Sequence, residues 1–119
     1  MADSSMKVLE KMLDIASFRQ KILASNIANS ETPGYKARDI SFQNELGKAK
    51  AAFEGAGPEV SPSYEVYEPV DTMPSQDGNT VNLDMEMAKV AENALLYNTA
   101  TQLISMKVRM LKDVLRGGR

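Results

Sequence analysis

The feature that most constrains this chain is a heptad repeat in its C-terminal third. Apolar side chains recur at alternating spacings of four and three residues over residues 83–116, which predicts one long helix with a packing seam. The seam comprises Leu83, Met87, Val90, Ala94, Tyr97, Thr101, Ile104, Val108, Leu111 and Leu115. A second apolar stripe, which includes Met106, runs beside it. Two adjacent stripes on one helix indicate more than one packing neighbour.

A second helix is predicted over residues 5–29. Met12, Leu23 and Ile27 belong to its apolar stripe, at spacings typical of a helix face. Ser4 or Ser5 is expected to cap its start. Pro33 and Gly34 end the helical pattern, because proline and glycine disfavour continuation. At the other end of the chain, Asn82 is the expected N-cap of the long helix.

Residues 30–82 form the middle of the chain. Phe42, Leu46, Ala49 and Phe53 have spacings of four and three, so a short helix is predicted over residues 41–54, capped by Ser41. Residues 63–70 alternate weakly and favour a short strand or hairpin arm. The expected fold is therefore mainly α in a single domain of residues 1–119. Its terminal helices pair as a coiled-coil-like hairpin, from which an irregular, acidic middle with little β-structure projects.

Composition excludes several function classes. Cysteine and histidine are both absent, which removes Cys and His nucleophiles, His general bases and Cys/His zinc sites. No catalytic residue, metal or cofactor is expected, and an enzyme is not predicted. The acidic residues Glu68, Asp71 and Asp77 favour a solvated loop over an acid–base pair. The sequence Asp77-Gly78-Asn79 favours a turn, since the remaining calcium-ligand spacing is missing.

Charge and hydropathy argue against nucleic acid and membranes as partners. The net charge is −2, and no segment is basic enough to predict nucleic-acid binding. The basic residues of 107–119 could indicate a membrane-surface helix, but charges that complement the helix dipole explain them more simply. Neither a signal peptide nor a bilayer-spanning apolar run is expected.

The exit from the first helix carries a compact motif. Asn26 and Asn29 lie three residues apart on one helix face, where their amides suit interhelical or capping hydrogen bonds. Residues 32–34 predict a sharp turn with Gly34 at positive φ. Tyr35 is expected to anchor the segment that follows. Taken on its physics alone, this motif is an ordinary helix stop followed by a turn.

The motif also resembles a family signature. Residues 25–35, SNIANSETPGY, are similar to the N-terminal signature of bacterial flagellar rod, hook and hook-associated axial proteins. Residues 36–42, KARDISF, and residues 77–84, DGNTVNLD, resemble the smallest rod subunits, as does the tail of residues 107–118. The resemblance gives the family-signature and assembly residues as Asn26, Ile27, Ala28, Asn29, Thr32, Pro33, Gly34 and Tyr35. Two alternatives to this small rod subunit stay open. The nearer one is the other proximal rod protein of similar size, and the more distant one is a soluble helical adaptor or secretion chaperone.

The resemblance implies a structural subunit of the proximal rod in the flagellar basal body, needed for motility. It implies export through the flagellar type III apparatus without a cleaved signal peptide, followed by assembly in the periplasm into a helical tube. The implied partners are copies of the chain, other rod proteins, the adaptor protein FliE, the membrane-ring protein and the export gate. Nucleic acid and direct bilayer insertion are not implied.

Overall fold

The computed structural model describes residues 4–55, 63–70 and 73–117. Its elements follow one another as α1 (Ser4–Ala28), β1 (Asp39–Ile40), α2 (Phe42–Glu54), β2 (Val66–Tyr67) and α3 (Leu83–Leu115). The mainly α fold and the two long terminal helices agree with the prediction. None of the helices within these ranges is both long enough and apolar enough to cross a lipid bilayer.

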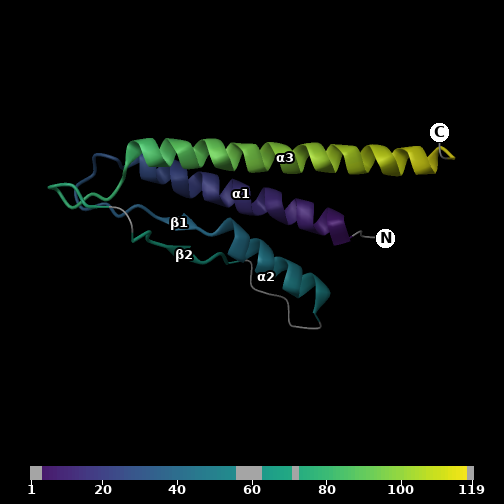
Figure 1. Cartoon of the computed structure of the whole chain (residues 1–119), viewed down its shortest axis with the longest axis horizontal. Coiled ribbons are helices and arrows are strands. Elements are labelled where there is room, and N and C mark those ends of the chain that lie inside the picture. The colour runs from purple at the N-terminus through teal and green to yellow at the C-terminus, as the bar shows by residue number, and fades with distance from the viewer. Residues whose placement is uncertain (1–3, 56–62, 71–72, 118–119) are drawn as a thin grey trace.

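Helices α1 and α3 lie side by side and antiparallel, so that the N- and C-terminal ends of the chain are at the same pole (Figure 1). Helix α3 has 33 residues and α1 has 25. At about 1.5 Å per residue, α3 is roughly 12 Å longer. The last two turns of α3 therefore extend beyond α1 at the pole that carries both termini (Figure 1).

The middle of the chain folds back along α1 instead of projecting from the helix pair. Ile15 and Ile22 of α1 form a buried cluster with Ile40, and the side chains packed against it are Phe18, Phe42, Leu46 and Tyr64. The rings of Phe18 and Tyr64 lie 4.9 Å apart between centroids. Burial of the apolar residues of α2 is favourable, and the side of α1 that carries Ile15 and Ile22 gives them a surface to pack against. The expectation of a projecting middle is thus wrong for this part of the chain.

Capping residues set the starts of α2 and α3. The Ser41 side chain accepts a hydrogen bond from the Asn44 backbone N–H, and the Asn82 side chain accepts one from that of Met85. Both are the predicted caps, and each satisfies a helix N–H that has no partner within the helix. Helix α1 already includes Ser4 and Ser5, so the prediction that Ser5 caps its start is wrong, and the residues before Ser4 lie outside the described ranges.

The β-structure is a two-stranded antiparallel ribbon. Asp39 pairs with Tyr67, and Ile40 pairs with Val66. The alternating window of residues 63–70 thus yields a strand of two residues only. The ribbon places Asp39 and Ile40, both buried, against α1, which matters for the site described next.

Candidate assembly surface

Asn26 is the centre of the junction between α1 and α3. Its amide nitrogen donates to the Arg38 carbonyl oxygen at 2.7 Å and to Glu86 Oε1, and its oxygen accepts from the Arg38 N–H at 3.1 Å and from the Tyr35 hydroxyl at 3.3 Å. The side chain is fully buried. Because these partners come from two segments, the stretch after α1 and the first turn of α3, Asn26 fixes how the chain leaves α1 relative to the start of α3.

The loop before α3 is bound to the loop after α1. Asn79 Nδ2 donates to the carbonyl oxygens of Asn29 and Thr32, at 2.9 and 2.7 Å. The Gly34 N–H donates to the Asp77 carbonyl oxygen at 2.9 Å. Gly34 has φ +75°, as predicted, a conformation that residues with a Cβ rarely adopt. The turn therefore has a fixed shape that brings two segments far apart in sequence together.

Asp77 is the titratable group of this junction whose pKa departs from its ordinary value of 3.8. The Ser75 hydroxyl and the Asn79 backbone N–H donate to its carboxylate, and these hydrogen bonds lower the pKa of Asp77 because they favour its charged form. The side chain is solvent-exposed. It closes a turn, which was the predicted role of this segment.

The fully buried positions of α3 are two polar residues and one alanine. They are Glu86, Asn93 and Ala100, which are seven residues apart and so form one heptad line. The seam predicted from the apolar repeat lies one position further round the helix. It shares only its half-buried members Val90 and Ile104 with the observed contact. The apolar stripe is therefore turned away from α1 rather than toward it.

A charged network accounts for the polar character of this contact. Arg19 of α1 forms two hydrogen bonds to Asp39, at 2.9 and 3.2 Å, and one to Glu92 of α3 at 2.9 Å. Lys89 lies 3.7 Å from Asp39 and 3.5 Å from Glu86. Burial opposes the charge of Arg19, but the carboxylates of Asp39 and Glu92 outweigh it and the pKa is raised. The network joins α1, α3 and the ribbon.

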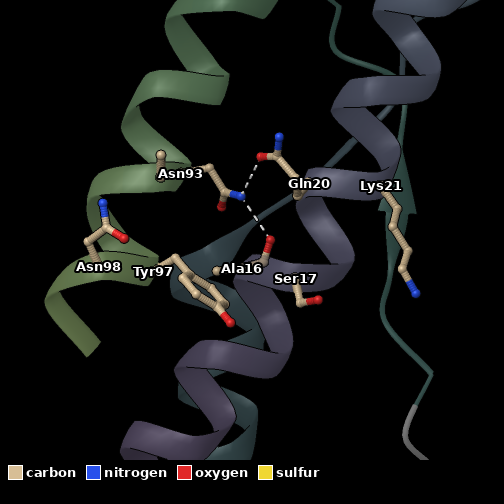
Figure 2. A pocket seen from close by; sticks show the side chains of 8 residues that line it. Ala16, Ser17, Gln20, Lys21, Asn93, Tyr97 and Asn98 are labelled. Carbon is tan, nitrogen blue, oxygen red and sulfur yellow. Dashed lines mark hydrogen bonds between the residues drawn. The ribbon is translucent and has the colours of Figure 1, made fainter. Parts of the chain in front are cut away.

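A groove opens between α1 and α3 halfway along the pair (Figure 2). It has a volume of about 440 Å³ and is lined by Ala16, Ser17, Gln20, Lys21, Asn93, Ala94, Tyr97 and Asn98. The Asn93 amide nitrogen donates to the Ala16 carbonyl oxygen at 2.8 Å and to Gln20 Oε1 at 3.1 Å (Figure 2). Asn93 thus ties the two helices together at the base of the groove.

Helix α3 exposes many large apolar side chains. Met106 is 54% exposed, Leu111 50% and Leu115 86%. Other large apolar side chains exposed on α3 are Leu83, Met87, Leu95, Tyr97, Leu103, Val108, Met110 and Val114. So many on one helix exceed the scattered apolar residues of an ordinary surface. Among the described residues, no element of the chain covers the last two turns of this helix.

The predicted site residues fall into two groups. Leu23 and Asn26 are buried, whereas Met12, Ile27, Asn29, Val90, Ile104 and Tyr35 are partly buried between elements. The remaining predicted residues are exposed: Ala28, Thr32, Pro33, Gly34, Leu83, Met87, Ala94, Tyr97, Thr101, Met106, Val108, Leu111 and Leu115. The first group holds the single chain together, and the second stays a predicted interface with other subunits.

The sequence reasoning missed the buried polar residues Arg19, Asp39, Glu86 and Asn93 as contact residues. A signal was present for two of them, because Glu86 and Asn93 are one heptad apart. Their role depends on Asn26, Ala16 and Gln20 lying opposite them, which a periodicity does not show. Within the described residues, no group of carboxylates is arranged to hold a metal ion.

The chain is similar in sequence to a known protein family. The family model described as "Flagella basal body rod protein" matches residues 13–36, the stretch that contains most of α1 and the junction turn. The flagellar basal body rod protein FlgB of Salmonella typhimurium is 34% identical over 98% of this chain and 96% of its own length. FlgB of Bacillus subtilis is 34% identical, with 93% and 92% covered, and FlgB of Cereibacter sphaeroides is 38% identical, with 83% and 84% covered.

Proposed function

Since the chain belongs to the FlgB family of flagellar basal body rod proteins, we propose that it is built into the proximal rod through the exposed apolar side chains of α3. The family is one of structural rod proteins and not of enzymes, and its place is the basal body rod. We also propose that the chain is exported, that it contacts neighbouring subunits in the assembled rod, and that motility requires it.

One observation carries the proposal: α3 buries Glu86 and Asn93 within the chain and leaves many large apolar side chains exposed, among them Met106, Leu111 and Leu115. Burying a Leu or Met side chain fully stabilises by about 1.5–3 kcal/mol. A single chain does not obtain this energy from the exposed residues, whereas packing against neighbouring subunits supplies it. The exposed apolar side chains are therefore the part of α3 that assembly buries.

The shape of the subunit supports an open helical array. The pole formed by the junction and the pole formed by the end of α3 differ in both chemistry and outline (Figure 1). Contacts between unlike patches propagate into rings or helical filaments rather than closing into a pair. In this proposal residues 1–119 act as one rod-subunit domain, and the helical tube is made by packing of terminal helices.

The implied route is export through the flagellar type III apparatus, without a cleaved signal peptide, into the periplasmic space. The absence of cysteine suits an oxidising compartment. A contact between α1 and α3 that contains Glu86, Asn93 and Arg19 is less strongly stabilised by burial than an apolar seam, which supports unfolding for export. Copies of the chain, other rod proteins, FliE, the membrane-ring protein and the export gate are the proposed partners.

The test is a deletion strain complemented with an epitope-tagged copy of this chain. The expected result is that the deletion strain is non-motile and lacks rods, and that the tagged chain is recovered in purified basal bodies once motility returns. Rods that form normally in the deletion strain would contradict the proposal. A chain that restores motility yet remains in the cytoplasm would favour an adaptor or chaperone instead.

A further inference from the structure

One side of α3 packs on α1 and then continues past the end of α1. That side carries Ala100, Ile104, Val108, Leu111 and Leu115, at spacings of four, four, three and four residues. Ala100 is fully buried and Ile104 partly buried, whereas Val108 is 36% exposed, Leu111 50% and Leu115 86%. The rising exposure indicates a helix-packing surface that α1 fills only in its first part. We call Val108, Leu111 and Leu115 the terminal apolar line.

The level at which α1 begins explains this gradient. Asn26 of α1 contacts Glu86 of α3, and Ser4 begins α1 22 residues before Asn26. Val108 lies 22 residues after Glu86. Ser4 and Val108 are therefore at about the same level, because both helices rise equally per residue. The turns after Val108 extend past α1, as the yellow end of α3 shows (Figure 1).

A drift of the apolar seam brings it to this side of α3. A seam with a period of 3.5 residues turns by about 20° per heptad on a helix of 3.6 residues per turn. At Met87 and Ala94 the seam lies beside the contact with α1, directly after the buried Glu86 and Asn93. From Ile104 onward the seam and the contact side coincide. The terminal apolar line is thus a direct continuation of the α1–α3 contact.

Three basic side chains flank the terminal apolar line. Arg109, Lys112 and Arg116 each follow directly after a residue of that line, so they form a neighbouring line on the helix surface, the basic line. All three are exposed, and no ion pair within the described residues includes any of them. The helix dipole favours cations within the last turn, but Arg109 precedes that turn. The dipole therefore does not account for the whole basic line.

The two lines define the kind of partner that fits. An apolar line at heptad spacing, placed in line with α1, fits a second helix. Basic side chains beside it fit carboxylates on that helix. Within this chain α1 has four bases and two acids, α2 two and two, and α3 four and four. None of these helices is acidic overall, which points to a helix from a different protein.

We propose that an acidic amphipathic helix of a different protein packs on the terminal apolar line, end to end with α1, and places carboxylates against the basic line. This inference rests on the proposed function and names the partner class for one part of the exposed surface of α3. An anionic membrane also attracts apolar and basic side chains. The terminal apolar line, however, continues a helix–helix contact at the spacing of that contact, which favours a helix as the occupant.

Binding of designed peptides to the purified full chain tests the charge of the partner. The probe is a three-heptad peptide with Leu at positions a and d and Glu at e and g, and its counterpart has Lys at e and g. Fluorescence anisotropy should show the Glu peptide binding about tenfold more tightly than the Lys peptide. Lys112→Glu should abolish this preference. Lys50→Glu should keep it, and is the matched control because Lys50 is an exposed lysine near the C-terminal end of α2.

Equal binding of the two peptides contradicts the inference, as does equal behaviour of Lys112→Glu and Lys50→Glu. Vesicles of phosphatidylcholine and phosphatidylserine test the membrane instead. Binding of the parent chain to these vesicles, lost in Lys112→Glu but kept in Lys50→Glu, would assign the basic line to lipid and overturn the inference. The thermal unfolding midpoints of the two variants should agree, which separates binding from the stability of the single chain.

Photo-crosslinking in purified basal bodies tests the source of the helix. A crosslinking residue at Leu115 should join this chain to a different protein, at a peptide that contains Asp or Glu and is apolar at helical spacing. The same residue at Gln43, exposed on α2, should not give that product. A product of two copies of this chain, or none although the chain is present in rods, overturns the inference and leaves the proposed function intact. Absence of the chain from basal bodies overturns the proposed function as well.

Discussion

The two poles of this molecule differ in how much of their structure the single chain can complete. At the junction pole, Asn26 and Asn79 satisfy backbone groups of the stretch after α1, and further along the pair Arg19 lies between two carboxylates. At the opposite pole, the last turns of α3 expose Leu111 and Leu115. Hydrogen bonds within the chain therefore fix the shape of one pole, whereas the other pole depends on contacts with a partner.

The largest expected effect is at the exposed pole. Leu111→Asp and Met106→Asp should each abolish rod incorporation and motility, because a carboxylate would have to be buried without a partner in the assembled contact. The isolated variants should unfold within about 0.5 kcal/mol of the parent chain, since both side chains are half exposed. Swimming assays measure motility, and chemical denaturation measures the free energy of unfolding of the isolated variants.

Gln43→Asp supplies the control, because Gln43 is exposed on α2 rather than α3 and the change removes no large apolar side chain. It should leave motility close to normal. Normal motility in Leu111→Asp would show that the exposed pole is not an assembly contact.

The charged network around Arg19 should respond in the opposite manner. Arg19→Met leaves Asp39 buried without its bidentate partner, and breaking a buried pair in this way costs about 3–5 kcal/mol of unfolding free energy. Urea denaturation followed by circular dichroism measures the loss. Lys21→Met, at an exposed position of the same helix, should change stability by less than about 0.5 kcal/mol. Similar losses of unfolding free energy for both variants would show that Arg19 does not stabilise the fold.

A smaller effect is expected at the junction turn. Gly34→Val should destabilise the chain by about 1–2 kcal/mol, the cost of placing a residue with a Cβ at the left-handed φ of +75°. A Cβ at this position meets no atom within 4 Å, so the loss comes from backbone strain alone. Gly34→Asn should lose less, since Asn tolerates this conformation. Equal losses in thermal unfolding would point to a cause other than strain.

The smallest effect concerns Asp77. Its pKa in the folded chain is below the ordinary value of 3.8, so its contribution to stability is complete above that value and is lost as the pH falls through the lower, folded-state pKa. The unfolding midpoint of the parent chain should therefore exceed that of Asp77→Asn near neutral pH. The gap should close below about pH 3.8. A gap independent of pH would show that the charge of Asp77 is not involved.

Much of this fold follows from local chemistry in the sequence. Asn82 and Ser41 are recognisable as caps because a short polar side chain precedes an apolar period of helical spacing. Gly34 is recognisable because a turn of this kind needs positive φ. These features depend on neighbours within a few residues, and the structure bears them out.

The rotation of α3 could not be predicted in the same way. An apolar repeat shows that a stripe will be covered, but it does not say by which chain. Glu86 and Asn93 are acceptable inside the molecule only because Asn26, Ala16 and Gln20 of α1 lie opposite them. These contacts join residues at least 60 positions apart, so no local pattern reports them.

The antiparallel pairing of α1 and α3 gives the subunit a direction. One pole carries the closed turn, and the other carries both chain termini and the extended end of α3 (Figure 1). Any polymer that stacks such subunits in a single orientation has two chemically different tips. Growth at one tip and anchoring at the other are then distinguishable processes. A binding protein can recognise the base of such a polymer without competing with the subunits added at its far end.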